Sequence, residues 1–359
     1  MSEPRWITLN SRDPDYLAYL RGTFSESLRA MPMHRQVEMK SQKKGYGEVV
    51  FQLRPLSELQ SPQPWKVWLQ AVRWSYLTFS LSPMLAALAM VYAKDWSMNF
   101  ALIMPSLIGV LLLQIAAHFF NDYYDHIKGV DHVRWRGNWV LQKGWLPAHA
   151  LQKAGIFCAG LAVALGMPAL FFNPQLIVGI GLLLAVGILE FTSNRFGLKY
   201  LGFGELTLFL LTGPLLSVGL VWTIAGRFDV DVVFLGLIFG LLTAFVYYLK
   251  NFEEMVVETR GLQPSLARLV GFYKSRTCLG RIVWLVPVLM VFAGLRWHAW
   301  LVVSFFSVFP VWALARAVKS ISSCLSSQVG RARRQGIRLH FVCGWIMILC
   351  FVSISIYWR

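Results

Sequence analysis

The sequence predicts an all-α, polytopic membrane protein, and three observations lead to this prediction. Hydrophobic residues make up 56% of the 359 residues and charged residues only 14%, whereas a soluble domain carries roughly 25% charged residues. The apolar residues come in successive runs of about 20, the length that a helix needs to cross a bilayer. The basic residues fall mostly in alternate connections between these runs. This composition excludes a soluble, a disordered or a collagen-like chain.

The first 64 residues form a separate polar region, so we divide the chain into an extension, 1–64, and a membrane domain, 65–359. The extension mixes basic, acidic and aromatic residues, and the run QSPQPW at 60–65 is typical of a linker. It lacks the pattern of a cleavable signal peptide. We expect a basic cytoplasmic appendage in which residues 15–31 form a short amphipathic helix.

Nine membrane-spanning helices are predicted from the apolar runs of the membrane domain. They are expected near residues 68–92, 99–120, 150–171, 175–191, 204–225, 231–249, 277–295, 298–317 and 338–357. Each run can cross a hydrocarbon core of about 30 Å, although 175–191 is at the lower limit.

The basic residues predict the orientation of these helices. With the N-terminus inside, 30 of the 34 Lys and Arg residues lie in or next to the inner segments, which leaves Lys94, Arg227, Arg296 and Arg359 outside. Because basic residues accumulate on the cytoplasmic side, we expect a bacterial-type inner membrane, a cytoplasmic N-terminus and a C-terminus on the opposite side. This asymmetry also explains the net charge of +16, and no nucleic-acid partner is expected. The five cysteines include no CxxC pair and predict no disulfide framework or zinc site.

Carboxylates gather after the second predicted helix, in the run NDYYDHIKGVD at 121–131. This run contains Asn121, Asp122, Asp125 and Asp131, which we call the first acidic motif. Concentrated carboxylates repel one another unless a cation neutralises them. Mg²⁺ suits them, because it commonly takes one or two protein carboxylates together with phosphate oxygens. The simpler alternative is a solvated loop with ordinary surface acids.

A similar run, NFEEMVVE at 251–258, follows the sixth predicted helix. Asn251 stands at the end of an apolar helix, and Glu254 and Glu258 share one helix face; these three residues are the second acidic motif. A solvated helix face is again the simpler alternative. However, the match between the two runs, four helices apart, suggests an internal repeat with a common site. Two such motifs could hold one diphosphate through two or three Mg²⁺ ions.

Polar residues in two further segments could contact phosphate oxygens. Lys143 stands in VLQKGW, and Arg195, Lys199 and Tyr200 stand in FTSNRFGLKYLGFGE. The alternative for the basic ones is a position at the membrane interface with no ligand. The histidines near the first acidic motif are expected to be interface or core residues rather than metal ligands.

These segments resemble the UbiA-type intramembrane aromatic prenyltransferases, and most closely their 1,4-dihydroxy-2-naphthoate polyprenyltransferase branch of menaquinone synthesis. The Asn-Asp-x-x-Asp loop with a later Asp is matched by the first acidic motif. VLQKGWL, FGLKYLGFGELTLFLLTGP and LVGFYKSR resemble further segments of that branch. The resemblance covers about residues 68–357 and not the extension.

The resemblance implies a UbiA-like helical bundle and an enzyme. It implies transfer of a polyprenyl group from a polyprenyl diphosphate to an aromatic acceptor, 1,4-dihydroxy-2-naphthoate, after Mg²⁺ has assisted ionisation of the diphosphate. The partners are therefore the diphosphate, the aromatic acceptor and the lipid bilayer. The implied metal ligands are Asn121, Asp125, Asp131, Glu254 and Glu258. The implied catalytic residues are Asn121, Asp122, Asp125, Lys199 and Tyr200. The implied diphosphate ligands are Lys143, Arg195, Lys199 and Asn251.

The second acidic motif departs from the family pattern in its charges. Glu254 and Glu258 stand where two Asp are usual, Glu253 replaces an Arg, and Gln263 replaces a Lys. Two positive charges are therefore lost and one negative charge is added. Two alternatives follow: a prenyltransferase with another aromatic acceptor, such as 4-hydroxybenzoate, or a catalytically degenerate relative that binds isoprenoids.

Overall fold

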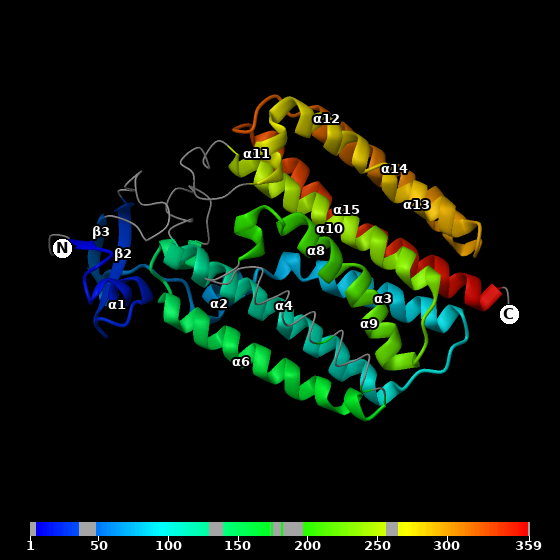
Figure 1. The fold of residues 1–359 in the computed structure, drawn as a ribbon, viewed down its shortest axis with the longest axis horizontal. Helices are drawn as coiled ribbons and strands as arrows, with labels where there is room; N and C mark the ends of the chain where they lie inside the picture. The colour runs from blue at the N-terminus through cyan, green and yellow to red at the C-terminus, as the bar shows by residue number, and fades with distance from the viewer. Residues whose placement is uncertain are drawn as a thin grey trace. The chain divides into compact units, whose positions relative to one another are not determined.

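The computed structural model describes residues 5–35, 48–128, 139–172, 174, 181, 197–255 and 265–357. The chain forms two compact units (Figure 1). The first comprises Met1–Trp74 and Ile115–Ala159, and the second comprises Ser75–Gln114 and Gly160–Arg359. Two of the three unit boundaries fall within long helices, and the third falls within a short 3-10 helix.

The first unit begins with a three-stranded antiparallel sheet, in the order β1-β3-β2 (Figure 1). The strands and the short helix between the first two are β1 (Arg5–Asn10), α1 (Tyr16–Arg21), β2 (Leu28–Arg35) and β3 (Glu48–Pro55). Val49 and Phe51 are fully buried, and because they are two residues apart they lie on one face of β3. Tyr16 and Leu20 of α1 are buried in the same small core.

The amphipathic helix expected over 15–31 is wrong. Only Tyr16–Arg21 is helical, and it ends at Gly22, whose φ of 74° is the left-handed conformation that glycine adopts readily at helix ends. Residues from Leu28 onward instead pair with β3. That pairing joins segments about 20 residues apart, so local helical periodicity did not reveal it.

Five helical segments complete the first unit. They are η1 (Leu56–Glu58), α2 (Pro64–Val72), the end of α4 (Phe100–Lys128), α5 (Trp139–Gln142) and the beginning of α6 (Ala148–Gly166). Val67, Phe119, Tyr123 and Leu151 are buried in their common core.

Hydrogen bonds attach the N-terminal sheet and α1 to this helical part. His126 near the end of α4 lies 3.0 Å from the carbonyl oxygen of Leu20 through Nε2. Nε of Arg29 donates to the carbonyl of Gly144 at 3.2 Å. Residues 5–35 and 48–55 are therefore not a loose appendage but part of a folded unit with the end of α4.

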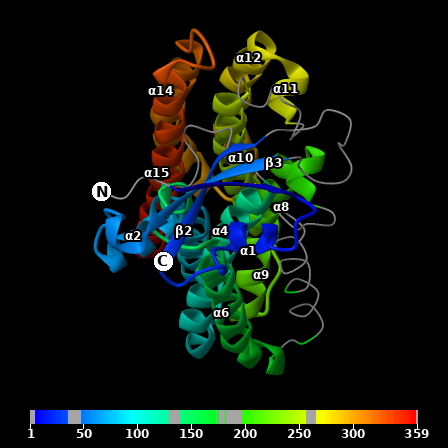
Figure 2. The ribbon, with the colours of Figure 1, turned by 90° about the vertical axis from the view of Figure 1, so that its left-hand side faces the viewer.

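The second unit is helical in all its described elements. These are η2 (Trp74–Tyr76) in part, α3 (Thr78–Ala93), the beginning of α4, the end of α6, η4 (Met167–Phe171), η5 (Leu198–Leu201), α8 (Gly204–Thr212), α9 (Pro214–Ala225), α10 (Val230–Glu254), α11 (Leu266–Val270), α12 (Phe272–Ile282), α13 (Leu285–Gly294), α14 (Ala299–Lys319) and α15 (Ser327–Tyr357). α15 packs against α3, α10 and α14, and Figure 2 shows α14 and α15 side by side. Phe239, Trp300 and Phe351 are fully buried between these helices.

A close approach between helices fixes the break between α8 and α9. A Cβ on Gly213, which separates the two helices, would lie 2.7 Å from the Cα of Gly240 on α10. Small residues are the usual means by which membrane helices come this close.

The surface of the second unit carries many apolar side chains. Leu295, Phe305, Phe309 and Leu349 are among those more than 60% exposed. Apolar exposure on this scale suits helices that face lipid rather than water. Seven helices of the described chain are long and apolar enough to cross a membrane, or eight if the bent pair Pro64–Tyr76 and Thr78–Ala93 is one span.

Eight of the nine predicted spans therefore have a counterpart. The seven candidates other than the bent pair are Phe100–Lys128, Ala148–Phe171, Gly204–Ala225, Val230–Phe252, Phe272–Gly294, Ala299–Lys319 and Ser327–Ile356. The span predicted at 175–191 lies outside the described residues, so the count of nine stays a prediction. Two helices are longer than the predicted apolar runs. α4 continues past residue 120 to Lys128, and α15 begins at Ser327, ahead of the run predicted from residue 338.

Candidate active site

The first acidic motif lies at the end of α4, where the helix continues past its apolar part. Asn121, Asp122 and Asp125 are 9%, 0% and 1% exposed. The alternative of a solvated loop with surface acids is therefore wrong for these three residues. Asp131 lies outside the described residues.

An amide orients one of the buried carboxylates. Asn121 and Asp125 are one helical turn apart, and Nδ2 of Asn121 donates to Oδ2 of Asp125 at 3.1 Å. This donation leaves the amide oxygen of Asn121 on the same helix face as the Asp125 carboxylate. The pair thus offers two kinds of hard oxygen atom on one face.

Arg73 forms a salt bridge with Asp122, and sequence reasoning missed it. Arg73 ends α2 in a left-handed conformation, with φ 55° and ψ 50°. Its guanidinium balances the charge of the fully buried Asp122 carboxylate, which would otherwise be costly. The sequence did contain a signal for this ion pair, because Arg73 is the one Lys or Arg residue within the predicted helix at 68–92. A charge inside an apolar span usually has a partner.

The histidines near the first acidic motif contact backbone rather than form a metal cluster. Nδ1 of His118 lies 2.9 Å from the carbonyl oxygen of Val72, and His126 contacts Leu20 as described above. His126 is 5% exposed, as expected of a core histidine. Within the described ranges, no group of three or more His, Cys, Asp or Glu side chains could hold a metal ion.

The second acidic motif begins at the end of α10. Asn251 is 7% exposed, and its Nδ2 donates to Oε1 of Glu205 on α8 at 2.8 Å. Glu205 is also buried, and its Oε2 has no hydrogen-bond partner within the described part of the chain. Glu254 is the last residue of α10. Glu258 and Gln263 lie outside the described residues, as do the side chains of Glu253 and Glu254.

The predicted phosphate ligands take different positions. Lys199 is 5% exposed in η5, which is bounded by Gly197 and Gly202, both with positive φ. Lys143 is exposed, with its Nζ 4.6 Å from the centroid of the Trp145 ring. Arg195 and the side chain of Tyr200 lie outside the described parts.

The donor set of the first acidic motif fits Mg²⁺. It provides an amide oxygen and buried carboxylates, the hard ligands that this ion binds. Asp122 is paired with Arg73, and the Asn121–Asp125 pair contributes an amide oxygen and a carboxylate on one helix face. A Mg²⁺ ion held there would complete its coordination shell with phosphate oxygens of a ligand.

The comparisons with known proteins place this chain in a family. Residues 80–342 match the UbiA prenyltransferase family. The chain therefore belongs to that family; it is a prenyltransferase and a multi-pass membrane protein, and the resemblance noted in the sequence is confirmed.

Several curated relatives carry one name. The 1,4-dihydroxy-2-naphthoate octaprenyltransferase of Bacillus subtilis is 26% identical over 280 residues, which cover 75% of this chain and 85% of the relative. The enzyme of that name from Haemophilus influenzae is 25% identical and covers 59% of this chain and 71% of the relative.

Solved structures share the fold. A UbiA homolog from Archaeoglobus fulgidus, bound to GPP and Mg²⁺, has a TM-score of 0.58 at 11% identity and covers 80% of this chain and 99% of that one. A UbiA homolog from Aeropyrum pernix K1 has a TM-score of 0.59 at 14% identity, with coverage of 76% and 97%. The likeness confirms a UbiA-type helical fold.

Proposed function

We propose that this prenyltransferase transfers a polyprenyl group from a polyprenyl diphosphate to 1,4-dihydroxy-2-naphthoate. The observation that carries the proposal is the similarity to bacterial enzymes of that name. It extends to the enzyme of Mycobacterium tuberculosis, which is 23% identical over 212 residues. The buried oxygen ligands of the first acidic motif supply the chemistry that a diphosphate donor requires.

We propose Mg²⁺ as the cofactor. Asn121, Asp125 and Asp131 would hold it in the first acidic motif, and Glu254 and Glu258 in the second. Bound there, Mg²⁺ would neutralise charge on the departing diphosphate and so favour ionisation of the allylic C–O bond. In support, a structural neighbour from Archaeoglobus fulgidus was solved with GPP and Mg²⁺.

The polar residues around each motif are proposed to position these ligands. Asn121 holds the Asp125 carboxylate by its amide. Arg73 keeps the neighbouring Asp122 charged while buried. Asn251 would combine two tasks, because it contacts Glu205 and is a proposed diphosphate ligand.

The cations proposed to bind diphosphate oxygens are Lys143, Arg195 and Lys199. A buried ammonium such as that of Lys199 interacts more strongly with phosphate than an exposed one, because less water screens it. We therefore expect Lys199 to contribute more than Lys143. Tyr200 is proposed to act next to Lys199.

The experiment is a membrane assay with a polyprenyl diphosphate and two acceptors, with and without Mg²⁺. We expect metal-dependent prenylation of 1,4-dihydroxy-2-naphthoate and little of 4-hydroxybenzoate. The reverse preference would assign another acceptor. Retention of the diphosphate with no turnover of either acceptor would favour an isoprenoid-binding relative.

We propose a bacterial inner membrane, with the N-terminus cytoplasmic and the C-terminus on the opposite side. A reporter fused after Arg359 should be periplasmic, and one inserted near Ser323 should be cytoplasmic. If both reporters lie on one side, the nine-helix topology is wrong.

A further inference from the structure

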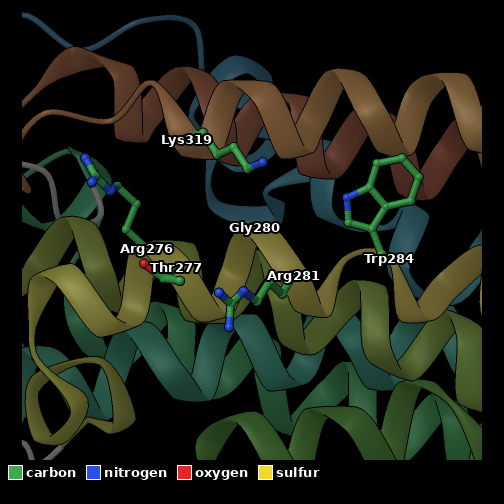
Figure 3. A pocket seen from close by; sticks show the side chains of 6 residues that line it. All are labelled: Arg276, Thr277, Gly280, Arg281, Trp284 and Lys319. Carbon is green, nitrogen blue, oxygen red and sulfur yellow. The ribbon is translucent and has the colours of Figure 1, made fainter.

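A pocket of about 460 Å³ opens between α12 and α14 in the second unit. It is lined by Arg276, Thr277, Gly280, Arg281, Trp284 and Lys319 (Figure 3). In the figure, Lys319 stands on α14, Arg276, Thr277, Gly280 and Arg281 stand on α12, and Trp284 lies just beyond the end of α12. None of the six belongs to either acidic motif.

The charges of this pocket are all positive. Arg276, Arg281 and Lys319 line it without a carboxylate among the lining residues. In the described part of the chain none of the three forms a salt bridge with a carboxylate. Like charges held together are unfavourable unless an anion compensates them. The pocket is therefore suited to a negatively charged group.

Two of the cations have neutral neighbours. Nη1 of Arg276 donates to the carbonyl of Ile321 at 3.0 Å, which orients the guanidinium. A Cβ at Gly280 would lie 3.7 Å from Cγ of Lys319, so the stem of that lysine packs along the bare backbone of Gly280. The missing side chain of Gly280 thus keeps space open between the two helices.

The pocket has a charged end and an apolar end. Trp284 lies eight residues beyond Arg276 in the sequence, in the turn between α12 and α13. Its ring is half-buried, and the side chain of Leu285 next to it is 48% exposed. A ligand that combines a phosphate with a hydrocarbon chain would match both ends.

The position of the pocket relative to the spans supports the same ligand. Lys319 is the last residue of the candidate span Ala299–Lys319, and Arg276 and Arg281 lie in the first half of the span Phe272–Gly294. Lys319 and Arg276 therefore lie close to the ends of their spans, and Arg281 lies one to two turns further along. Basic pockets between spans on the cytoplasmic side bind anionic lipid head groups, and Trp is common at that level.

We propose that this pocket binds the phosphate of an anionic phospholipid. Arg276, Arg281 and Lys319 contact the phosphate, and an acyl chain lies along Trp284. The site is separate from the proposed transfer reaction and requires neither a prenyl diphosphate nor Mg²⁺.

The test measures lipid binding to the full-length protein after delipidation in a neutral detergent. Native mass spectrometry counts bound dioleoyl phosphatidylglycerol against dioleoyl phosphatidylcholine. A third arm uses inorganic phosphate as competitor. We expect preferential retention of phosphatidylglycerol, and no displacement by millimolar phosphate, because the acyl chain contributes to binding.

Two variants and two controls make the test specific. Arg281→Gln with Lys319→Gln should lower the affinity for phosphatidylglycerol about tenfold or more, because two cations are lost. Gly280→Leu should have a similar effect by filling the pocket without a change of charge. Arg316→Gln is the matched control, because Arg316 stacks on Trp312 at 4.7 Å and does not line the pocket. Arg296→Gln, beyond the other end of α13, is the second control.

Equal retention of the two lipids would overturn the proposal. So would unchanged phosphatidylglycerol binding in both pocket variants. Complete displacement by inorganic phosphate would show a site for a free anion, and the assignment to a lipid would then be wrong.

Discussion

Two buried amide–carboxylate pairs in the described part of the chain are built alike but differ in the charges beside them. In the first unit Asn121 donates to Asp125, and in the second Asn251 donates to Glu205. Each asparagine stands at the end of a long apolar helix. Both pairs therefore place a carboxylate where the apolar part of a span ends.

The difference lies in the charges beside each pair. Next to Asp125, the buried Asp122 has the guanidinium of Arg73 as its partner. No salt bridge to Glu205 occurs in the described ranges, and one of its oxygens has no hydrogen-bond partner there. A cation of the fold thus lies next to the first pair, on the neighbouring carboxylate of Asp122. In the second pair, Oε2 of Glu205 can still accept a hydrogen bond from a bound group. The charge of Glu205 should therefore contribute less to the stability of the fold than the charge of Asp122.

The largest effect on stability is expected from Arg73→Gln. This change leaves the Asp122 carboxylate buried without its cation, and breaking a buried pair from one side costs about 3–5 kcal/mol. The apparent unfolding temperature of the detergent-solubilised protein should fall accordingly.

A second substitution shows whether the loss comes from the ion pair. Arg73→Gln combined with Asp122→Asn removes both charges and should recover most of the stability. If the double variant is as unstable as Arg73→Gln, the backbone conformation of residue 73 matters rather than the pair.

The next largest effect is expected on catalysis, from substitutions in the second acidic motif. Replacing Glu254 or Glu258 by Gln keeps the size of the side chain but removes a negative charge. If these residues hold a metal ion, turnover should fall about 10²-fold or more, which corresponds to roughly 2.7 kcal/mol. Turnover across a Mg²⁺ titration is the measurement.

Two further variants of this motif should behave oppositely. Glu254→Asp keeps the charge and should retain activity, and Glu253→Arg should maintain or raise affinity for the diphosphate. Parental activity in both Gln variants would mean that the motif is a solvated helix face.

A smaller effect is expected from Glu205→Gln. The new amide oxygen can still accept from Asn251, while an unbalanced buried charge disappears. The unfolding temperature should therefore change little, by the equivalent of about 1 kcal/mol or less, in contrast to Arg73→Gln. A loss as large as that of Arg73→Gln would show that Glu205 has a charged partner in the fold.

The smallest effect concerns a third polar cluster, where Lys94 contacts Asp229 at 3.4 Å and Asp231 at 2.5 Å. Burial raises the pKa of Asp229. The backbone N–H of Asp231 and the Lys94 ammonium together lower that pKa by more, so it lies below its ordinary value of 3.8. Asp229 therefore stabilises the fold above pH 3.8, and this stability is lost as the pH falls below it.

The variant that tests this is Asp229→Asn, which keeps the acceptor for the Asp231 N–H. It should reduce the acid sensitivity of unfolding by the equivalent of about 1 kcal/mol or less, since the pair is partly exposed. An unchanged pH profile of the unfolding temperature between pH 3 and 6 would contradict this role.

The sequence predicted the spans well because apolar length is a local property. Eight runs correspond to candidate spans of the structure, and the buried first acidic motif follows the second of them. The N-terminal sheet was missed, because Phe51 and Ala30 meet only through pairing of distant strands. The contacts of Arg73 with Asp122 and of Glu205 with Asn251 were missed for a related reason, because each joins residues about 50 positions apart in the sequence. Asp131, Arg195 and Glu258 lie outside the described residues, and their roles stay predictions.

The measurement that tests the central claim most directly is the turnover of Asp125→Ala across a Mg²⁺ titration. The control is Asp15→Ala, which removes an exposed acid of the first unit that makes no side-chain cap for α1. With 1,4-dihydroxy-2-naphthoate and a polyprenyl diphosphate, Asp125→Ala should insert and accumulate normally but lose at least about 10²-fold in rate. Asp15→Ala should match the parent. Normal, Mg²⁺-dependent turnover of Asp125→Ala would contradict the assignment of the Asn121–Asp125 pair as metal ligands of this enzyme.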